Sequence, residues 1–332
     1  MDIHLGLFCT SLIDQKGFIM IKVFPALMRK REPVGEPVTW TQKAVSGQGF
    51  NPCGIAYGNG NWVMGTVASD GIFTSTDPNS GWTEYTTTVF GTSHIIGAIS
   101  YGNGYWVAGT DRLDGGPLLG TATDPTSTWT LRTSNYPATS QIRSFAYGNG
   151  YWVGVGSANL KFITATDPTG TWTLRDLASA ANLSDVAYGN GYFVIAADAQ
   201  GIYATTDPTS SWTQQGPFSG TEIYGVAYGN GYWVAVGYGG RIYTATNPTS
   251  TWTLRTNSFA VGDLIYDVAY GNGAFVAISG TNKIATATDP TSTWTQRTSN
   301  ITTNYLAQVA CGNNLWVALG AAGTISTATP GK

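Results

Sequence analysis

A word of four residues, Tyr-Gly-Asn-Gly, recurs along the chain and limits what the chain can fold into. It starts at Tyr57, Tyr101, Tyr147, Tyr188, Tyr228 and Tyr270, and a degenerate seventh copy starts at Cys311. A Trp-Thr pair keeps step with it, at Trp40, Trp82, Trp129, Trp172, Trp212, Trp252 and Trp294. The spacing runs from 40 residues (188 to 228) to 46 residues (101 to 147), which is typical of a four-stranded propeller blade. We therefore predict an all-β chain, a seven-bladed β-propeller of four-stranded antiparallel blades.

The unit around Tyr228 shows how one blade is built. Its four strands are expected at residues 223–228, 232–237, 241–246 and 252–256. Asn230-Gly231 joins the first two strands and is the signal of a type I′ hairpin, because both turn positions need a positive φ. Asn247-Pro248 precedes the fourth strand, where the Asn side chain can cap the turn and Pro fixes the next φ.

The two ends of the repeat region complement each other. The last unit, built from Leu306–Thr329, stops where its fourth strand should follow, and residues 35–42 (GEPVTWTQ) resemble that missing piece. We predict that the strand starting at Trp40 completes the C-terminal blade and so removes an open sheet edge. The propeller then spans residues 36–332. Residues 1–35 form an N-terminal arm, apolar at 18–24 and basic at 29–31, that we expect to anchor or dock the protein.

Composition excludes several classes of function. Only 11% of the 332 residues are charged and the formal net charge is -3, which leaves no basic footprint for nucleic acid. No run of about 18 apolar residues is present, so no membrane insertion is expected. The first residues lack the basic start of a secretion signal, and either Met1 or Met20 could be the natural start.

Acidic residues stand five positions before most of the repeated tryptophans. The pairs are Asp77–Trp82, Asp124–Trp129, Asp167–Trp172, Asp207–Trp212 and Asp289–Trp294, with Asn247–Trp252 as the amide version. With Ser75, Thr128 and Thr171, this pattern resembles the Asp-box, or BNR repeat, of sialidase-like β-propellers, of the kind found in bacteriophage and bacterial surface proteins. It departs from the family pattern because Pro follows each acid and Thr or Asn replaces the inner glycine. The resemblance implies that these acids are turn caps on the outer hairpin of each blade and not catalytic groups.

A sialidase active site is not matched, so we predict no catalytic residues. Such a site needs three arginines that bind the substrate carboxylate, a tyrosine nucleophile with a glutamate as its base, and an aspartate that acts as the acid. Four arginines follow the Trp-Thr word and belong to outer strands: Arg132, Arg175, Arg255 and Arg297. An alternative is a glycoside-active enzyme that uses Asp185 and Asp267, three residues before the repeated word on inner strands. The competing interpretation is that these two acids line the central channel and are solvated by water.

Cysteines and histidines predict neither a disulfide nor a metal site. Cys53 and Cys311 fall in neighbouring blades at heights about 13 Å apart, which is beyond disulfide reach, so we predict thiols at both. His4 and His94 have no acid or cysteine at metal-ligand spacing. No metal or cofactor is expected.

Variation between copies is the better clue to function. The Asn-Gly and Asp-Pro turns are nearly identical and share one face of an up-and-down propeller, whereas the loops after the second and fourth strands differ and share the other face. Loops held by a rigid scaffold carry function more often than the scaffold does. We define this second face as the variable face. Its candidate ligand-binding residues are Phe90, Asp111, Arg112, Asp114, Tyr136, Phe218, Glu222, Tyr238, Phe259 and Asp263.

The predicted function is therefore non-enzymatic. We expect a bacteriophage virion protein, a tail or fibre-associated receptor-binding protein or a surface decoration, that binds a cell-surface glycan or a protein through exposed aromatic residues. Residues 1–35 would contact other virion or surface proteins. The expected location is the particle surface or tail, with an extracellular or bacterial cell-surface location as the alternative. A multivalent lectin with one sugar site per blade is a further alternative, and the competing interpretation of the aromatic residues is that they cover the gaps between blades.

Overall fold

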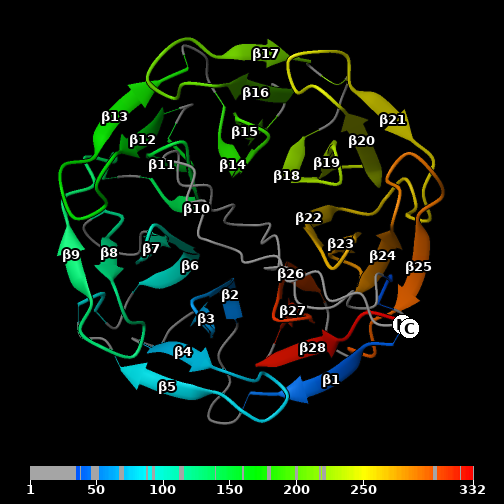
Figure 1. The fold of residues 1–332 in the computed structure, drawn as a ribbon, viewed down its shortest axis with the longest axis horizontal. Coiled ribbons are helices and arrows are strands. Elements are labelled where there is room, and N and C mark those ends of the chain that lie inside the picture. The colour runs from blue at the N-terminus through cyan, green and yellow to red at the C-terminus, as the bar shows by residue number, and fades with distance from the viewer. Residues whose placement is uncertain are drawn as a thin grey trace, which may run out of the picture.

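Seven four-stranded antiparallel sheets stand around a central axis, as Figure 1 shows. The structure is a computed structural model, and it describes residues 35–37, 39–45, 52–66, 71–86, 89–91, 94–111, 116–138, 140–158, 161–177, 181–198, 201–216, 218, 222–301, 305–321 and 323–331. The predicted all-β, seven-bladed propeller is confirmed. The predicted arm lies outside the described residues except for Gly35.

Each blade runs from an inner strand beside the axis to an outer strand at the rim. Blade 1 contains β2 (Pro52–Gly58), β3 (Asn61–Thr66), β4 (Gly71–Ser75) and β5 (Thr83–Thr86), and blade 2 contains β6 (Ile95–Gly102), β7 (Tyr105–Asp111), β8 (Leu119–Ala122) and β9 (Thr130–Arg132). Blade 3 contains β10 (Ile142–Gly148), β11 (Tyr151–Gly156), β12 (Lys161–Ala165) and β13 (Thr173–Asp176), and blade 4 contains β14 (Leu183–Gly189), β15 (Tyr192–Ala197), β16 (Gly201–Thr205) and β17 (Thr213–Gln215). Blade 5 contains β18 (Ile223–Gly229), β19 (Tyr232–Gly237), β20 (Arg241–Ala245) and β21 (Thr253–Arg255), and blade 6 contains β22 (Ile265–Gly271), β23 (Ala274–Ser279), β24 (Lys283–Ala287) and β25 (Thr295–Thr298). Blade 7 contains β26 (Leu306–Gly312), β27 (Leu315–Gly320), β28 (Thr324–Ala328) and, as its outer strand, β1 (Thr41–Ala44).

The predicted closure of the ring by an N-terminal strand is confirmed. β1 pairs with β28 in antiparallel register, from Thr41 opposite Thr327 to Ala44 opposite Thr324. Trp40 is fully buried just before this strand, and its carbonyl accepts a hydrogen bond of 2.6 Å from Nδ2 of Asn300. Blade 7 therefore joins the two ends of the described chain, and no blade is left with an incomplete sheet.

The repeated Tyr-Gly-Asn-Gly word is explained by contacts between neighbouring blades. The Asn of each turn has a positive φ, as at Asn230 (47°), so the predicted type I′ hairpins are confirmed. The Gly that precedes this Asn lies against the aromatic residue of the repeated word in the next blade. A Cβ added to Gly229, for example, would stand 2.0 Å from Cγ of Tyr270. Tyr270 also packs on Phe275 of its own blade, with ring centroids 4.8 Å apart. The word is therefore a hairpin combined with a stacking contact around the axis.

The predicted turn caps are also confirmed. In blade 3, Oδ1 of Asp167 accepts hydrogen bonds from the backbone N–H of Thr169 at 2.8 Å and from its hydroxyl at 2.7 Å. These bonds hold the pKa of Asp167 below its usual value. The backbone carbonyl of Pro168 also accepts a hydrogen bond of 3.1 Å from the indole of Trp172, which ties the turn to the repeated tryptophan.

Charged residues at the outer rim link each blade to the next one. In blade 3, Nε of Arg175 on β13 donates to the hydroxyl of Thr164. Arg175 also lies near Asp207 of blade 4, and its positive charge helps to lower the pKa of Asp207. In the same way, the charge of Arg132 helps to lower the pKa of Asp167 and that of Arg255 the pKa of Asp289. Lys43 on β1 has this effect on Asp77 of blade 1. Where the turn of blade 5 carries Asn247, the preceding outer strand carries the neutral Gln215, which donates to the carbonyl of Thr249 at 2.8 Å.

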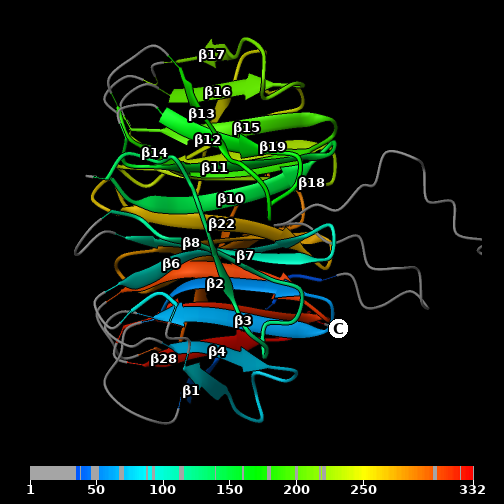
Figure 2. The ribbon, with the colours of Figure 1, turned by 90° about the vertical axis from the view of Figure 1, so that its left-hand side faces the viewer.

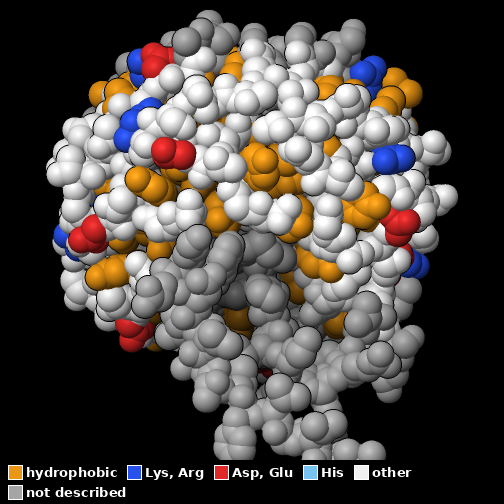
Figure 3. All heavy atoms as spheres, turned by 45° about the horizontal axis from the view of Figure 1, so that its top comes forward, with side chains coloured by type: hydrophobic (Ala, Val, Ile, Leu, Met, Phe, Trp, Pro, Cys, Tyr) orange, Lys and Arg blue, Asp and Glu red, His pale blue; other side chains and the backbone are white. Residues whose placement is uncertain are grey.

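Glu36 extends this contact to the closing strand. Its carboxylate accepts hydrogen bonds from Thr286, from the backbone of Thr288 and from Arg297 of blade 6. Glu36 therefore meets the outer arginine of the preceding blade, as the turn Asp does in other blades, but its hydrogen bonds go to blade 6 and do not cap its own turn. The prediction that these arginines belong to the outer rim is confirmed, and Figure 3 shows small, separate spots of both charges toward the edge of the face it presents.

The two faces of the disc differ in which turns they carry. A cavity is lined by Asn313 and Asn314 of one hairpin turn, by Asp77 and Pro78 of a capped turn, and by Thr329 near the C-terminus. Both repeated turns and the C-terminus thus share one face, as predicted, and the strands run from it to the opposite, variable face (Figure 2). In the described residues, no helix is long and apolar enough to cross a membrane.

Candidate functional site: the variable face

Two of the predicted surface aromatics, Phe90 and Tyr136, are core residues. Phe90 is 0% exposed and packs on Trp129, with ring centroids 6.0 Å apart. Tyr136 is 6% exposed, donates its hydroxyl to the carbonyl of Lys161 at 3.0 Å, and has a pKa raised by burial. The expectation that these two rings are exposed is wrong, because their loops turn inward and fill the gap between blades.

Phe218 and Phe259 are half-buried. Phe218, in the connection between blades 4 and 5, stacks on Tyr243 of blade 5, with ring centroids 4.4 Å apart and planes 25° apart. Phe259 packs against the hydrophobic cluster between blades 5 and 6. Both rings close blade gaps, which was the competing interpretation of the surface aromatics.

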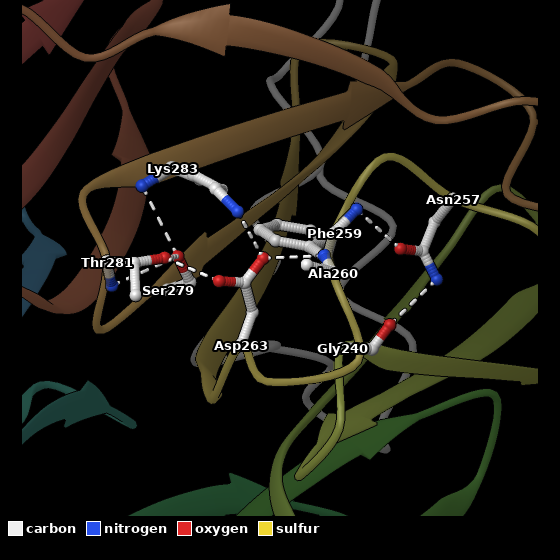
Figure 4. A network of polar contacts seen from close by, with 8 residues as sticks. All are labelled: Gly240, Asn257, Phe259, Ala260, Asp263, Ser279, Thr281 and Lys283. Atoms are coloured by element: carbon white, nitrogen blue, oxygen red, sulfur yellow. Dashed lines mark hydrogen bonds and ion pairs between the residues drawn. The ribbon is translucent and has the colours of Figure 1, made fainter.

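Asp263 is the centre of a loop network and not an open ligand site (Figure 4). The residue is 3% exposed, and its carboxylate pairs with Nζ of Lys283 at 2.6 Å and accepts from the hydroxyl of Thr281 at 2.8 Å. The backbone N–H of Ala260 donates a third hydrogen bond at 2.7 Å. Burial would raise the pKa of Asp263, but these partners outweigh it and hold the pKa below its usual value. The network fixes the loop between β21 and β22 against the start of β24.

The remaining predicted residues divide into two groups. Asp111 ends β7, whereas Arg112 and Asp114 lie outside the described residues. Glu222 and Tyr238 are exposed, and Tyr238 keeps 49% of its surface accessible. The backbone N–H of Tyr238 donates to the carbonyl of Glu222 at 2.9 Å, so the two residues are held side by side.

Sequence reasoning missed a ring of bulged residues at the mouth of the channel. Each inner strand skips one residue in its register with the second strand: Cys53, Gly97, Arg143, Ser184, Tyr224, Tyr266 and Ala307. We call these seven residues the bulge ring. In every blade the residue before the bulge is buried and the bulged residue is partly or fully exposed. Bulges re-aim side chains and are frequent beside active sites.

Over blades 4 to 6, hydroxyl and aromatic groups of the bulge ring lie beside two carboxylates, those of Glu222 and Asp198. The hydroxyl of Tyr224 donates to Oε2 of Glu222, and Tyr224 and Tyr266 lie with their ring centroids 6.0 Å apart. In blade 4 the hydroxyl of Ser184 donates to Oδ1 of Asp198 at 2.6 Å. Burial, the hydrogen bond to Glu222 and the charges of Glu222 and Asp198 all raise the pKa of Tyr224, so its hydroxyl stays protonated.

Below the ring, the channel is narrow and polar in places. A small cavity of about 30 Å³ is lined by inner strands, with Arg143 near one end and Tyr57 and Cys311 near the other. Neither Cys53 nor Cys311 is in a disulfide, as predicted, and burial raises the pKa of the Cys311 thiol.

Asp185 and Asp267 are both buried, and Asp267 lines the channel cavity as expected. Their carboxylates are held by protein groups. Asp185 accepts from the hydroxyl of Ser144 in blade 3 at 2.7 Å and from the backbone N–H of Val226 in blade 5 at 2.9 Å. Asp267 accepts from the backbone N–H of Val309 in blade 7 at 3.0 Å. Each carboxylate therefore links inner strands of neighbouring blades, since an unpaired N–H there would be costly.

Comparisons with known proteins show the fold. The chain is similar to YCF48 bound to a D1 peptide, with 13% identity, a TM-score of 0.70 and coverage of 90% of this chain and 98% of that one. Virginiamycin B lyase from Staphylococcus aureus gives 15% identity, a TM-score of 0.74 and coverage of 88% and 99%. The GH74 xyloglucanase from Xanthomonas campestris gives 12% identity, a TM-score of 0.67 and coverage of 88% and 54%.

No protein-family model and no curated protein sequence matches the chain. These structural relatives include a peptide-binding protein and enzymes, so the shared fold carries no one function. The chain is a seven-bladed β-propeller of the same general kind as these proteins.

Proposed function

We propose that the protein is a non-enzymatic binding module that recognises a carbohydrate through its variable face. The observation that carries the proposal is the group of tyrosines and carboxylates at the channel mouth, in which Tyr266 and Glu222 are exposed and Tyr224 and Asp198 are half-buried. Sugars present apolar C–H faces that pack on aromatic rings and hydroxyls that donate to carboxylates.

The scaffold supports binding rather than catalysis. Asp185 and Asp267, the acids that a glycosidase would use here, are 4% and 3% exposed and accept backbone hydrogen bonds from neighbouring blades. A glycosidase needs both carboxyl groups at the sugar. Turnover of a glycan panel that disappears in Asp185→Asn or Asp267→Asn, with the fold retained, would contradict the proposal.

The module belongs, in this proposal, to a bacteriophage particle and binds a host-surface glycan. The support is the low charge and the near-identical repeats, which resemble those of propellers in phage and bacterial surface proteins. Residues 1–35 would attach the module to the particle. An antibody against the propeller should then label assembled particles, and a chain that starts at residue 36 should fail to be incorporated.

The direct test is binding of the purified chain to immobilised saccharides, followed by calorimetry with the strongest ligand. Because only blades 5 and 6 carry a tyrosine in the bulge ring, we expect one sugar site per chain. A stoichiometry of one site per blade would instead favour the multivalent lectin, and a chain that binds no saccharide would refute the proposal.

A further inference from the structure

The bulge ring is the most varied position of the inner strands. The seven bulged positions hold Cys, Gly, Arg, Ser, Tyr, Tyr and Ala, and the next position also varies. From the second residue after the bulge the copies repeat closely, and most end in Ala-Tyr-Gly. A bulged residue has no partner in the strand register, so its side chain can change without altering the ladder. Variation at this one height of the blades gives the channel mouth different chemistry on each side.

We infer that the bulge ring selects the ligand of the variable face, and that this ligand is a neutral saccharide bound over blades 4 to 6. The inference rests on the proposed carbohydrate binding and adds both the site and the class of sugar.

Tyr266 and Tyr224 supply the stacking surface. Tyr266 keeps 37% of its surface exposed, although it stands at the mouth between two blades. Gly280, in the loop after β23, makes room for its ring, because a Cβ there would lie 2.8 Å from Cε2 of Tyr266. The tilt of 56° between the Tyr224 and Tyr266 rings forms an angled pair of walls rather than one flat surface. Such an angle suits a saccharide ring that contacts one tyrosine with its face and the other with its edge.

Glu222 and Asp198 supply oriented acceptors. Each already accepts one hydrogen bond from a hydroxyl of the bulge ring: Glu222 from Tyr224, and Asp198 from Ser184. These bonds position the carboxylates and leave further lone pairs for hydroxyl donors of a sugar. Both carboxylates also repel a second negative charge, which disfavours sialic acids and uronic acids at this place.

The nearby basic groups do not reverse this preference. Arg143 is the basic member of the bulge ring and lies on blade 3, where its Nη2 donates to Oε1 of Gln141 at 3.4 Å. Lys283, at the start of β24 in blade 6, is held by Asp263, so their charges offset each other. Arg143 therefore offers N–H donors to the ether and hydroxyl oxygens of a neutral sugar at the edge of the acidic half.

The test compares Tyr266→Ala with Tyr238→Ala, a matched Tyr-to-Ala change on the same face but outside the bulge ring. Wild type is first applied to an array of neutral hexosides, N-acetylhexosaminides, uronic acids and sialosides, and then titrated with the methyl glycoside of the best ligand. We expect neutral sugars to bind, Tyr266→Ala to weaken binding at least tenfold, and Tyr238→Ala to change it less than threefold. Circular dichroism and thermal melting confirm that each variant is folded.

Glu222→Gln provides a second measurement that a purely structural role would not change. Removal of one negative charge should weaken neutral-sugar binding and, at the same time, raise the affinity for the matching uronic acid. If Tyr238→Ala abolishes binding while Tyr266→Ala binds normally, the assignment of the sugar site to the bulge ring is wrong, although the proposed function stands. A preference of wild type for acidic sugars also refutes the inference, and no binding to any saccharide refutes both proposals.

Discussion

Replacing Trp40 by Ala tests whether the strand from the N-terminal side of the propeller is a structural part of blade 7. The indole is fully buried in a cluster that joins Val276 and Ile278 of blade 6 to Leu306 and Trp316 of blade 7. Truncation of a buried Trp to Ala costs about 3–5 kcal/mol. At roughly 2 °C per kcal/mol for a large chain, the midpoint of thermal unfolding should fall by about 6–10 °C.

Trp294 is the matched control, because it is the equivalent residue of blade 6, whose four strands come from one continuous segment. It is 1% exposed, and its indole donates to the carbonyl of Pro290 at 3.2 Å. The Nε1 atom of Trp40 has no hydrogen-bond partner among the described residues. Trp294→Ala should therefore cost about 1 kcal/mol more than Trp40→Ala, for the lost hydrogen bond.

Differential scanning calorimetry of the two variants and of a chain lacking residues 36–45 measures these differences. The deletion should lower the melting temperature further than Trp40→Ala does, because it also removes the pairing with β28 and the contacts of Glu36. Melting of the deleted chain at the wild-type temperature would refute closure by β1.

Three further predictions follow from contacts between blades. Burial would raise the pKa of Glu36, but hydrogen bonds and the charge of Arg297 outweigh it and hold the pKa below the ordinary value of 4.5, so the stabilisation by Glu36 is complete above that value and is lost as the pH falls through the native pKa. Glu36→Gln should therefore flatten the acid side of a plot of melting temperature against pH, and an unchanged plot would contradict this. Asp267→Ala leaves the buried N–H of Val309 unpaired and should lower the free energy of unfolding in urea by about 1–3 kcal/mol, with a smaller loss for Asp267→Asn. Gly229→Ala forces a Cβ into Tyr270 and should cost about 1–3 kcal/mol by the same assay, and a neutral effect would show that the ring can move aside.

The architecture could be predicted from sequence because its signals are local. An Asn-Gly pair specifies its own hairpin, and an Asp-Pro pair caps its own turn, as Asp167 does with Thr169 two residues later. The closure was predictable for the same reason, since residues 35–42 carry the local pattern of an outer strand without its inner partners.

The site was harder to predict because it depends on partners in other blades. A bulge such as that at Tyr224 exists only relative to the register of the second strand, which the sequence of one strand does not contain. Asp185 finds its N–H partner at Val226, 41 residues away, so it read as an isolated polar residue beside the channel. Phe90 and Tyr136 occur in loops of variable sequence, and whether such a loop turns inward depends on the space that the neighbouring blade leaves.

The contacts between blades also explain why the repeats remain so similar while one position varies. A Gly in one blade needs the small volume because a Tyr of the next blade presses on it, and an Arg on one outer strand lies beside the Asp of the next turn. A change in one unit therefore favours a change in its neighbour, as the neutral pair of Gln215 and Asn247 shows. The bulged residue stands outside this register, so its variation costs the scaffold little. Recognition can then be confined to the channel mouth, where six residue types occupy the seven bulged positions on a frame of seven similar blades.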